Sequence, residues 1–117
     1  MTMNVLICLD TDGTIDTGKP AGPVLTRWLE LLQSNGAIVV LVSPSPNCPK
    51  GRNNLPLFTQ IASKSRRENL EDSVRWVQLY GMDPILKLYV SNNNDRIEAE
   101  QAGFMFVDEK SFAGARF

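Results

Sequence analysis

Two hydrophobic patterns alternate along the chain. Short, continuous apolar runs are typical of strands that are buried on both faces of a parallel sheet. These runs are residues 5–9, 37–42, 57–61, 85–90 and 104–107. Segments in which apolar residues recur every three or four positions predict helices, and a glycine directly follows each of them, as is common where a helix ends. The helical segments are residues 20–35, 66–80 and 95–102.

The alternation of strands and helices defines the expected fold class. It predicts an α/β fold, a three-layer α/β/α sandwich with a parallel sheet of four or five strands. The 117 residues suit a single domain over residues 1–117. Residues 43–56 contain four prolines and one glycine, which predicts a loop with at most one short helical turn. The residues after 107 are expected to form a short tail.

The composition removes several classes of chemistry. There is no histidine, which excludes histidine triads, histidine metal sites and histidine general bases. Two cysteines, Cys8 and Cys48, are too few for a zinc or disulfide framework. The net charge of −1 does not indicate a nucleic-acid partner. The run 5–9 is too short to span a membrane and lacks the features of a signal peptide, so we expect a cytoplasmic protein without a membrane partner.

Polar residues suited to chemistry follow the predicted strands. Ligands of parallel sheets bind beyond the carboxyl ends of the strands, so these positions form the candidate site. They are Asp10, Asp12 and Thr14 after the first strand, Ser43 after the second, Lys64 after the third and Asn92 to Asp95 after the fourth. Asp10 and Asp12 would repel each other, and Mg²⁺, which prefers oxygen ligands, would offset that repulsion. The alternative is a plain Asp-Gly turn, but residues 15–20 are too polar for the second strand of a hairpin.

These residues resemble the motifs of the haloacid dehalogenase-like (HAD) hydrolases. Residues 9–15, Leu-Asp-Thr-Asp-Gly-Thr-Ile, resemble the first motif, an apolar strand followed by Asp-x-Asp-Gly-Thr. Residues 38–43 are similar to the second motif, Lys64 falls at the lysine of the third, and residues 88–103 resemble the fourth motif and its helix. The resemblance covers nearly the whole chain. It implies a HAD-like Rossmannoid sheet with strand order 5-4-1-2-3.

The resemblance also implies a function, that of a Mg²⁺-dependent phosphomonoester phosphatase. Asp10 would be the nucleophile that forms an aspartyl-phosphate, and Asp12 the general acid and then the general base. Residues Thr14, Ser43 and Lys64 would bind the phosphate. The implied Mg²⁺ ligands are Asp10, the backbone carbonyl of Asp12, and Asn92 or Asp95.

The chain departs from the family pattern at two places. Pro44 lacks the backbone N–H with which many members bind phosphate. In the fourth motif one acid is missing: alignment on the strand end puts Asn92 at the metal-binding acid, whereas counting back from Gly103 puts Asp95 at the second acid. The two registers differ by one residue, and both stay open. The alternative for residues 92–94 is a plain polar turn.

Three cations lie where the second long helix begins, although the helix dipole disfavours cations there. A bound anion at this helix start would compensate for them. We expect Lys64 to belong to the site. We expect Arg66 and Arg67 to face water or to pair with the acidic residues of the same helix, Glu68, Glu71 and Asp72.

The chain has no room for the cap domain that covers the site in many family members. An open, capless site suits a large phosphorylated substrate, such as a nucleic-acid end or a phosphoprotein, or a neighbouring subunit that acts as a lid. Lys50 and Arg52 are expected to be solvated loop residues. One rival is a catalytically eroded HAD-like domain that binds a partner or a phosphorylated ligand. The other, a receiver domain, needs an aspartate at the end of the third strand, and the residues around Ser63 supply none.

Overall fold

A five-stranded, all-parallel β-sheet forms the centre of the protein. The structure is a computed structural model that describes residues 4–43, 45–84, 86–92 and 95–114. The strands are β1 (Val5–Leu9), β2 (Ile38–Leu41), β3 (Thr59–Gln60), β4 (Leu86–Ser91) and β5 (Met105–Asp108). They lie in the order β3-β2-β1-β4-β5, which confirms the α/β class and the expected order with the first strand central.

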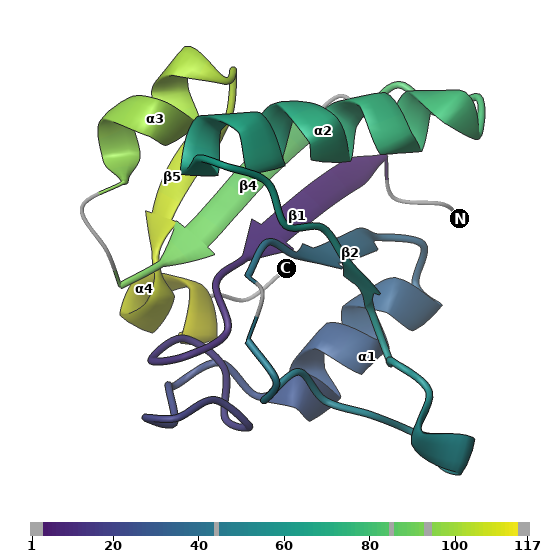
Figure 1. Ribbon diagram of the computed structural model, residues 1–117, viewed down its shortest axis with the longest axis vertical. Helices are drawn as coiled ribbons and strands as arrows, with labels where there is room; N and C mark the ends of the chain where they lie inside the picture. Colours follow the sequence, from purple (N-terminus) through teal and green to yellow (C-terminus); the bar gives the residue numbers. More distant parts are fainter. Residues whose placement is uncertain (1–3, 44, 85, 93–94, 115–117) are drawn as a thin grey trace.

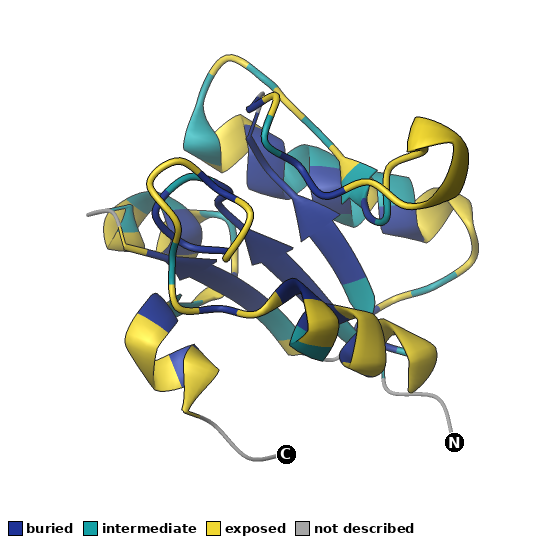
Figure 2. Cartoon of the chain, turned by 90° about the horizontal axis from the view of Figure 1, so that it is seen from below, coloured by how far each residue is buried: buried dark blue, intermediate teal, exposed yellow. Residues whose placement is uncertain are grey.

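Helices cover both faces of this sheet. They are α1 (Thr26–Ser34), α2 (Arg66–Leu79), α3 (Arg96–Gln101) and α4 (Glu109–Ala113), and a 3₁₀ turn, η1, covers Arg52–Asn54. Helices α2 and α3 lie on one face and α1 and α4 on the other (Figure 1). The inner strands β1, β2 and β4 are mostly buried, whereas the edge strands β3 and β5 and the outward faces of the helices are partly or fully exposed (Figure 2). This arrangement is the predicted three-layer sandwich.

The position of β1 explains why the first apolar run is continuous. Successive strand side chains point to opposite faces, so Leu6 and Cys8 pack toward α2 while Ile7 and Leu9 pack toward α1 and α4. The helix residues in these two clusters include Leu70 and Val77 on one face and Leu29, Leu32 and Phe112 on the other. A strand between two cores has to be apolar at every position. The first polar side chain, Asp10, therefore marks the carboxyl end of the strand.

The start of α1 differs from the prediction of a helix from residue 20. The helix begins at Thr26, because the backbone before it is bonded elsewhere. Val24 forms a parallel bridge with Ile15, and its N–H donates to the carbonyl of Thr14 at 3.0 Å. The Asp16 carboxylate accepts hydrogen bonds from the backbone N–H and the hydroxyl of Thr26, at 3.1 and 2.5 Å. Asp16 thus supplies the N-terminal cap that the leucine before the helix does not.

Two further elements differ from the prediction. Strand β3 covers Thr59–Gln60 rather than all of residues 57–61. The expected tail after residue 107 instead contains α4, because the Asp108 carboxylate caps it by accepting from the N–H of Lys110 at 2.9 Å and Phe112 is buried in the core. A helix of this length is too short to give a periodic pattern. Ile85, the first residue of the predicted fourth strand, lies outside the described residues.

The loop of residues 16–23 fixes the turn that follows β1. This β1 turn comprises residues 10–14. Within this β1 turn, the N–H of Thr14 donates to the carbonyl of Thr11 at 3.2 Å. The N–H of Gly13 donates to the carbonyl of Pro20 at 2.6 Å. Gly22 lies directly against the backbone of Thr14, where a β-carbon would collide. The loop of residues 16–23 therefore supports the β1 turn from outside.

This close approach yields a prediction about stability. Gly22→Ala forces the loop away from Thr14 and should lower the free energy of unfolding by about 1–3 kcal/mol, the usual effect of overpacking. Gly114→Ala is the matched control, because its β-carbon would lie 3.6 Å from the nearest atom, in ordinary contact. Urea unfolding of both variants measures the difference. Equal stability of the two variants would contradict the tight packing of this loop.

Candidate active site

Asp10 lies at the carboxyl end of the central strand and is 7 % exposed. Its Oδ1 accepts a hydrogen bond from the N–H of Thr11 at 3.0 Å and lies 3.5 Å from Nη2 of Arg66. Burial raises the pKa of Asp10 above its usual value, and the Arg66 charge and the Thr11 N–H oppose that rise. Asp10 is therefore a buried carboxylate with one cation beside it.

Arg66 occupies this position because it is the first residue of α2. Its Nη1 donates to the carbonyl of Val42, which follows β2, and its Nε lies 3.5 Å from Oδ2 of Asp95. The guanidinium carbon lies 5.5 Å from the ring centroid of Tyr89. The side chain is 17 % exposed, so the expectation that Arg66 faces water or pairs within its own helix was wrong.

The neighbouring cations behave differently. Arg67 is half exposed and pairs with Glu71 at 3.5 Å within α2, as expected. Lys64 is exposed and makes no hydrogen bond or ion pair with any residue that the structure describes. Between them, the Ser65 hydroxyl caps α2 by accepting from the N–H of Glu68 at 3.1 Å, so the helix starts after Lys64. The cap directs Arg66, rather than Lys64, toward Asp10.

Asp12 is held by hydrogen bonds from two loops. Its Oδ1 accepts from the N–H of Lys19 at 2.9 Å and from Ser45 Oγ and Asn47 Nδ2 at 3.1 Å each. The Lys19 N–H is the main cause of a pKa of Asp12 below its usual value, and Asn47 and Ser45 add to it. Ser45 and Asn47 were not predicted from the sequence. Pro44, which precedes them, lies outside the described residues.

The predicted phosphate-binding residues Thr14 and Ser43 are both buried beyond the ends of β1 and β2. Ser43 directly follows Val42, whose backbone carbonyl accepts a hydrogen bond from Arg66. The Thr14 hydroxyl donates to Oε2 of Glu109, the first residue of α4, at 3.3 Å. Thr14 thus supports the β1 turn through α4. Glu109 was not predicted from the sequence either, because its partner Thr14 is far away in the chain.

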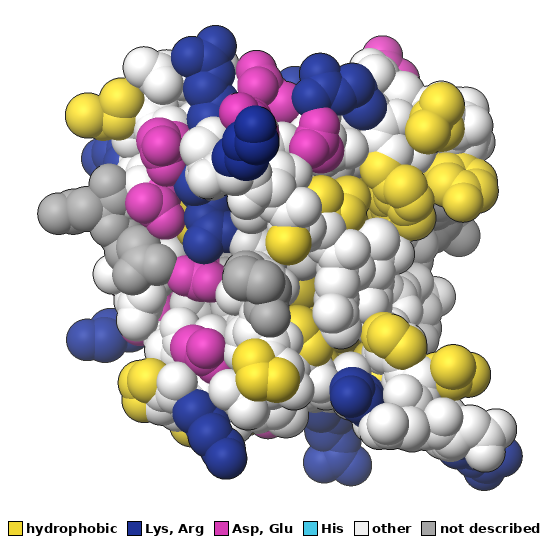
Figure 3. Space-filling view, viewed as in Figure 1, with side chains coloured by type: hydrophobic (Ala, Val, Ile, Leu, Met, Phe, Trp, Pro, Cys, Tyr) yellow, Lys and Arg dark blue, Asp and Glu magenta, His cyan; other side chains and the backbone are white. Residues whose placement is uncertain are grey.

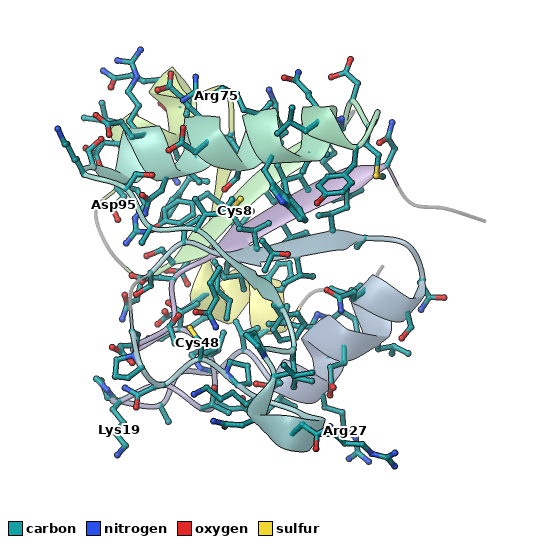
Figure 4. The ribbon with its side chains drawn as sticks, turned by 45° about the vertical axis from the view of Figure 1, so that its right-hand side comes forward. Cys8, Lys19, Arg27, Cys48, Arg75 and Asp95 are labelled. Carbon is teal, nitrogen blue, oxygen red and sulfur yellow. The ribbon has the colours of Figure 1, made fainter. Side chains whose placement is uncertain are left out.

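The two candidate residues of the fourth motif have different partners. Asn92 follows β4, is exposed, and donates through Nδ2 to the carbonyl of Gly13 at 3.3 Å. Asp95 accepts a hydrogen bond from the Tyr89 hydroxyl at 3.1 Å and pairs with Arg66 beside the start of α2 (Figure 4). Asn92 therefore lies at the β1 turn, whereas Asp95 lies beside Arg66. Residues 93 and 94 lie outside the described part of the chain.

The described residues offer only a sparse set of donors for a metal ion, and both of its carboxylates are paired with Arg66. Among the described residues there is no group of three or more Cys, Asp or Glu side chains that could hold a metal ion. The Asp10 carboxylate and the Asn92 amide come from neighbouring strand ends, and both offer the oxygen atoms that Mg²⁺ prefers. The second carboxylate, Asp95, is paired with Arg66. Charge on the ligands is a main determinant of affinity, so this set is weaker than one with two free carboxylates.

Within the part of the chain that the structure describes, the cysteines and the other cations add no second site. Both cysteines are free and buried, and burial raises the pKa of Cys8 to about 12, which makes it a poor nucleophile. Lys50 and Arg52 are exposed on the loop around η1, as expected. Figure 3 shows Lys and Arg side chains intermixed with Asp and Glu over α2 and α3, so this face is not uniformly basic.

The described helices include none that is long and apolar enough to cross a membrane. Comparisons with known proteins give no match: no family model, no curated protein and no solved structure matches this chain.

The burial of Glu109 yields a prediction about pH. Burial is the main cause that raises its pKa, so the folded protein binds this proton more tightly than the unfolded chain does. The resulting stability is present below the ordinary glutamate pKa and is lost as the pH rises through the raised value. Glu109→Gln keeps an acceptor for Thr14 and cannot ionise. Its free energy of unfolding, relative to the unmodified protein, should therefore increase from about pH 4 to about pH 7.

Urea unfolding at several pH values measures this difference. Glu30→Gln, on the exposed face of α1, controls for the removal of a surface carboxylate. A difference for Glu109→Gln that is constant across the pH range would contradict the prediction.

Proposed function

We propose that the chain is a phosphohydrolase that cleaves phosphomonoesters through Asp10. The observation that carries this proposal is a buried carboxylate at the carboxyl end of the central strand, with the Arg66 guanidinium 3.5 Å from it. A fixed cation beside a carboxylate nucleophile lets an anionic phosphoryl group approach and stabilises its charge during transfer. The resemblance of residues 9–15 to the first HAD motif supports the same reaction.

The reaction proceeds in two displacements at phosphorus. An oxygen of Asp10 attacks the phosphorus, the bond to the leaving oxygen breaks, and Asp12 gives that oxygen a proton. Asp12 then takes a proton from a water molecule, whose oxygen attacks the aspartyl-phosphate. The bond between phosphorus and Asp10 breaks, which releases phosphate and restores the carboxylate.

Asp12 has to change partners during this cycle. Its Oδ1 accepts three hydrogen bonds that favour the ionised carboxylate, the form suited to the water-activating step. To act first as an acid, it has to exchange donors such as Ser45 and Asn47 for the substrate. Both donors lie on the loop after β2, so movement of this loop would release Asp12.

Mg²⁺ fits this reaction as a cofactor. The Asp10 carboxylate, the Asp12 backbone carbonyl and the Asn92 amide would hold it, with Asp95 as the second candidate acid. Bound there, the ion would supply positive charge that reduces repulsion between the carboxylate and the phosphate.

Arg66, Ser43 and Lys64 form the proposed phosphate-binding set. Arg66 is fixed beside Asp10, and the exposed ammonium of Lys64 is available to a ligand. None of the residues that the structure describes forms an inserted domain over this site, so a large phosphorylated substrate fits best, with a neighbouring subunit as the alternative cover.

One observation favours a second candidate function, a domain that binds a partner or a phosphorylated ligand without turnover. Arg66 already offsets the charge of Asp10 and Asp95 without a metal ion. A phosphate held by Arg66 would then not need to react. The receiver alternative is disfavoured by the strand order, because receivers have the order 2-1-3-4-5.

Asp10→Asn tests the nucleophile. The change keeps the shape and removes the attacking charge, so turnover of a generic aryl phosphate with Mg²⁺ should be abolished. The folded structure should persist, because the neutral amide suits the buried position. Phosphate release and thermal unfolding measure the two effects. Turnover by the variant at the rate of the unmodified protein would exclude the mechanism, and no turnover by the unmodified protein would favour the binding domain.

A comparison of cations tests the phosphate-binding set. Arg66→Gln should weaken inhibition by vanadate by about tenfold or more, the scale of a lost charge-assisted hydrogen bond. Lys64→Gln should weaken it less, because the lysine has to be ordered on binding. Arg67→Gln, which breaks only the exposed pair with Glu71, is the control. Equal inhibition of all three variants and the unmodified protein would remove Arg66 and Lys64 from the set.

A further inference from the structure

The ion pair between Arg66 and Asp95 places a hydrogen-bond donor and an acceptor side by side in the proposed phosphate site. Nε of Arg66 lies 3.5 Å from Oδ2 of Asp95, and Nη2 lies 3.5 Å from Oδ1 of Asp10. Both distances exceed that of a good hydrogen bond, and the buried Nε atom has no hydrogen-bond partner among the described residues. On this edge the guanidinium is therefore held by charge, and a ligand has no short hydrogen bond to break.

Asp95 is the carboxylate suited to accept a hydrogen bond from a ligand. The Tyr89 hydroxyl donates to its Oδ2 at 3.1 Å. Burial raises the pKa of Tyr89, so this hydroxyl keeps its proton and stays a donor. No described residue donates a hydrogen bond to the other oxygen, Oδ1. The side chain of Asp95 is 26 % exposed, against 9 % for Asp10, so Asp95 is more open to a ligand.

The carboxylates around Arg66 disfavour a fully ionised ligand. Asp95 faces Arg66 from α2, Tyr89 from β4 and Asp10 from β1. The charges of Asp12 and Asp95 both raise the pKa of Asp10, so the three carboxylates act on one another. A ligand oxygen that approaches the arginine therefore also meets negative charge. An oxygen that carries a proton can instead donate a hydrogen bond to a carboxylate.

We propose that the site selects a phosphate group that carries a proton: Arg66 donates to one oxygen of the group, and Asp95 accepts a hydrogen bond from a P–OH oxygen of the same group. The inference rests on the proposed function, since it names the ionic form of phosphate that the same site binds. The proton stays on the phosphate oxygen, and no bond to phosphorus changes. The arrangement needs no metal ion.

This selection defines the class of ligand. A phosphomonoester loses its second proton near pH 6, so the site favours the singly ionised ester. Inorganic phosphate is the corresponding small probe, because it also carries a proton. Sulfate has the same tetrahedral shape but no proton to donate, so it would accept from Arg66 and leave Asp95 as an unpaired negative charge beside it. The comparison of these two anions isolates the role of Asp95.

Calorimetric titration of the full chain with inorganic phosphate and with sulfate, at equal ionic strength and without divalent cations, tests the inference. At about pH 6, the unmodified protein should bind phosphate about tenfold or more tightly than sulfate, the scale of a charge-assisted hydrogen bond. Asp95→Asn should bring the two affinities close together, because the amide can donate to sulfate and carries no charge that repels it. The Asp95 side chain makes no capping hydrogen bond to α3, so the variant should keep this helix.

Two further variants complete the test. Asp83→Asn is the matched control, because it removes an exposed carboxylate that precedes β4, at the opposite end of the strand, and it should leave the preference unchanged. Tyr89→Phe keeps the ring beside Arg66 and removes the hydroxyl that fixes Asp95, so it should reduce the preference less than Asp95→Asn does. Thermal unfolding checks that each variant is folded.

Three results overturn the inference. They are equal binding of phosphate and sulfate by the unmodified protein, a preference for phosphate that both Asp95→Asn and Tyr89→Phe retain in full, and the absence of phosphate binding.

The inference and the proposed function fail in different ways. If Asp10-dependent turnover is present but sulfate binds as tightly as phosphate, the inference alone is wrong. If the preference for phosphate depends on Asp95 but the protein releases no phosphate from an aryl ester, the proposed hydrolysis alone is wrong.

Discussion

The removal of the Asp10 carboxylate from water is the constraint on which the site depends. The fold places this residue at the end of a strand that is buried between two cores, and burial makes its negative charge unfavourable. The charge is stabilised by the N–H of Thr11 and by Arg66. The β1 turn presents the N–H of Thr11 to this carboxylate, and α2 begins where its first residue, Arg66, can pair with it. Much of the local architecture therefore serves one ionised group.

The sheet topology brings the other site elements to this group. Parallel strands β1, β2 and β4 end at the same edge, so residues far apart in the chain surround Asp10. The Ser45 hydrogen bond to Asp12 and the Asn92 hydrogen bond to Gly13 cross from one strand end to another, and the Asp95 pair with Arg66 joins the end of β4 to the start of α2. The site is thus a product of strand order. Among the described residues, the resulting cluster has more carboxylates than cations.

The sequence predicted the sheet and the position of Asp10 because both depend on local patterns. Continuous apolar runs mark buried strands, and the first polar residue after each run marks its carboxyl end. The role of Arg66 was not predicted, because it depends on which residue caps α2. Ser65 is the cap, so the helix starts after Lys64. Arg66, two residues further along the chain, is therefore the cation that faces the sheet. Glu109 was missed because its contact with Thr14 joins the two ends of the chain, where no local pattern operates.

The bridge between Ile15 and Val24 has a consequence for how this site could be remodelled. It closes the base of the loop, so the chain leaves the β1 turn and returns to α1 at nearly the same place. A segment inserted at the exposed tip, near Thr17, would add closure entropy that grows only slowly with its length and would leave the paired base intact. The tip of the loop could therefore accept additional chain as long as the packing of Gly18 on Thr11 and the hydrogen bond from the Lys19 N–H to Asp12 are kept.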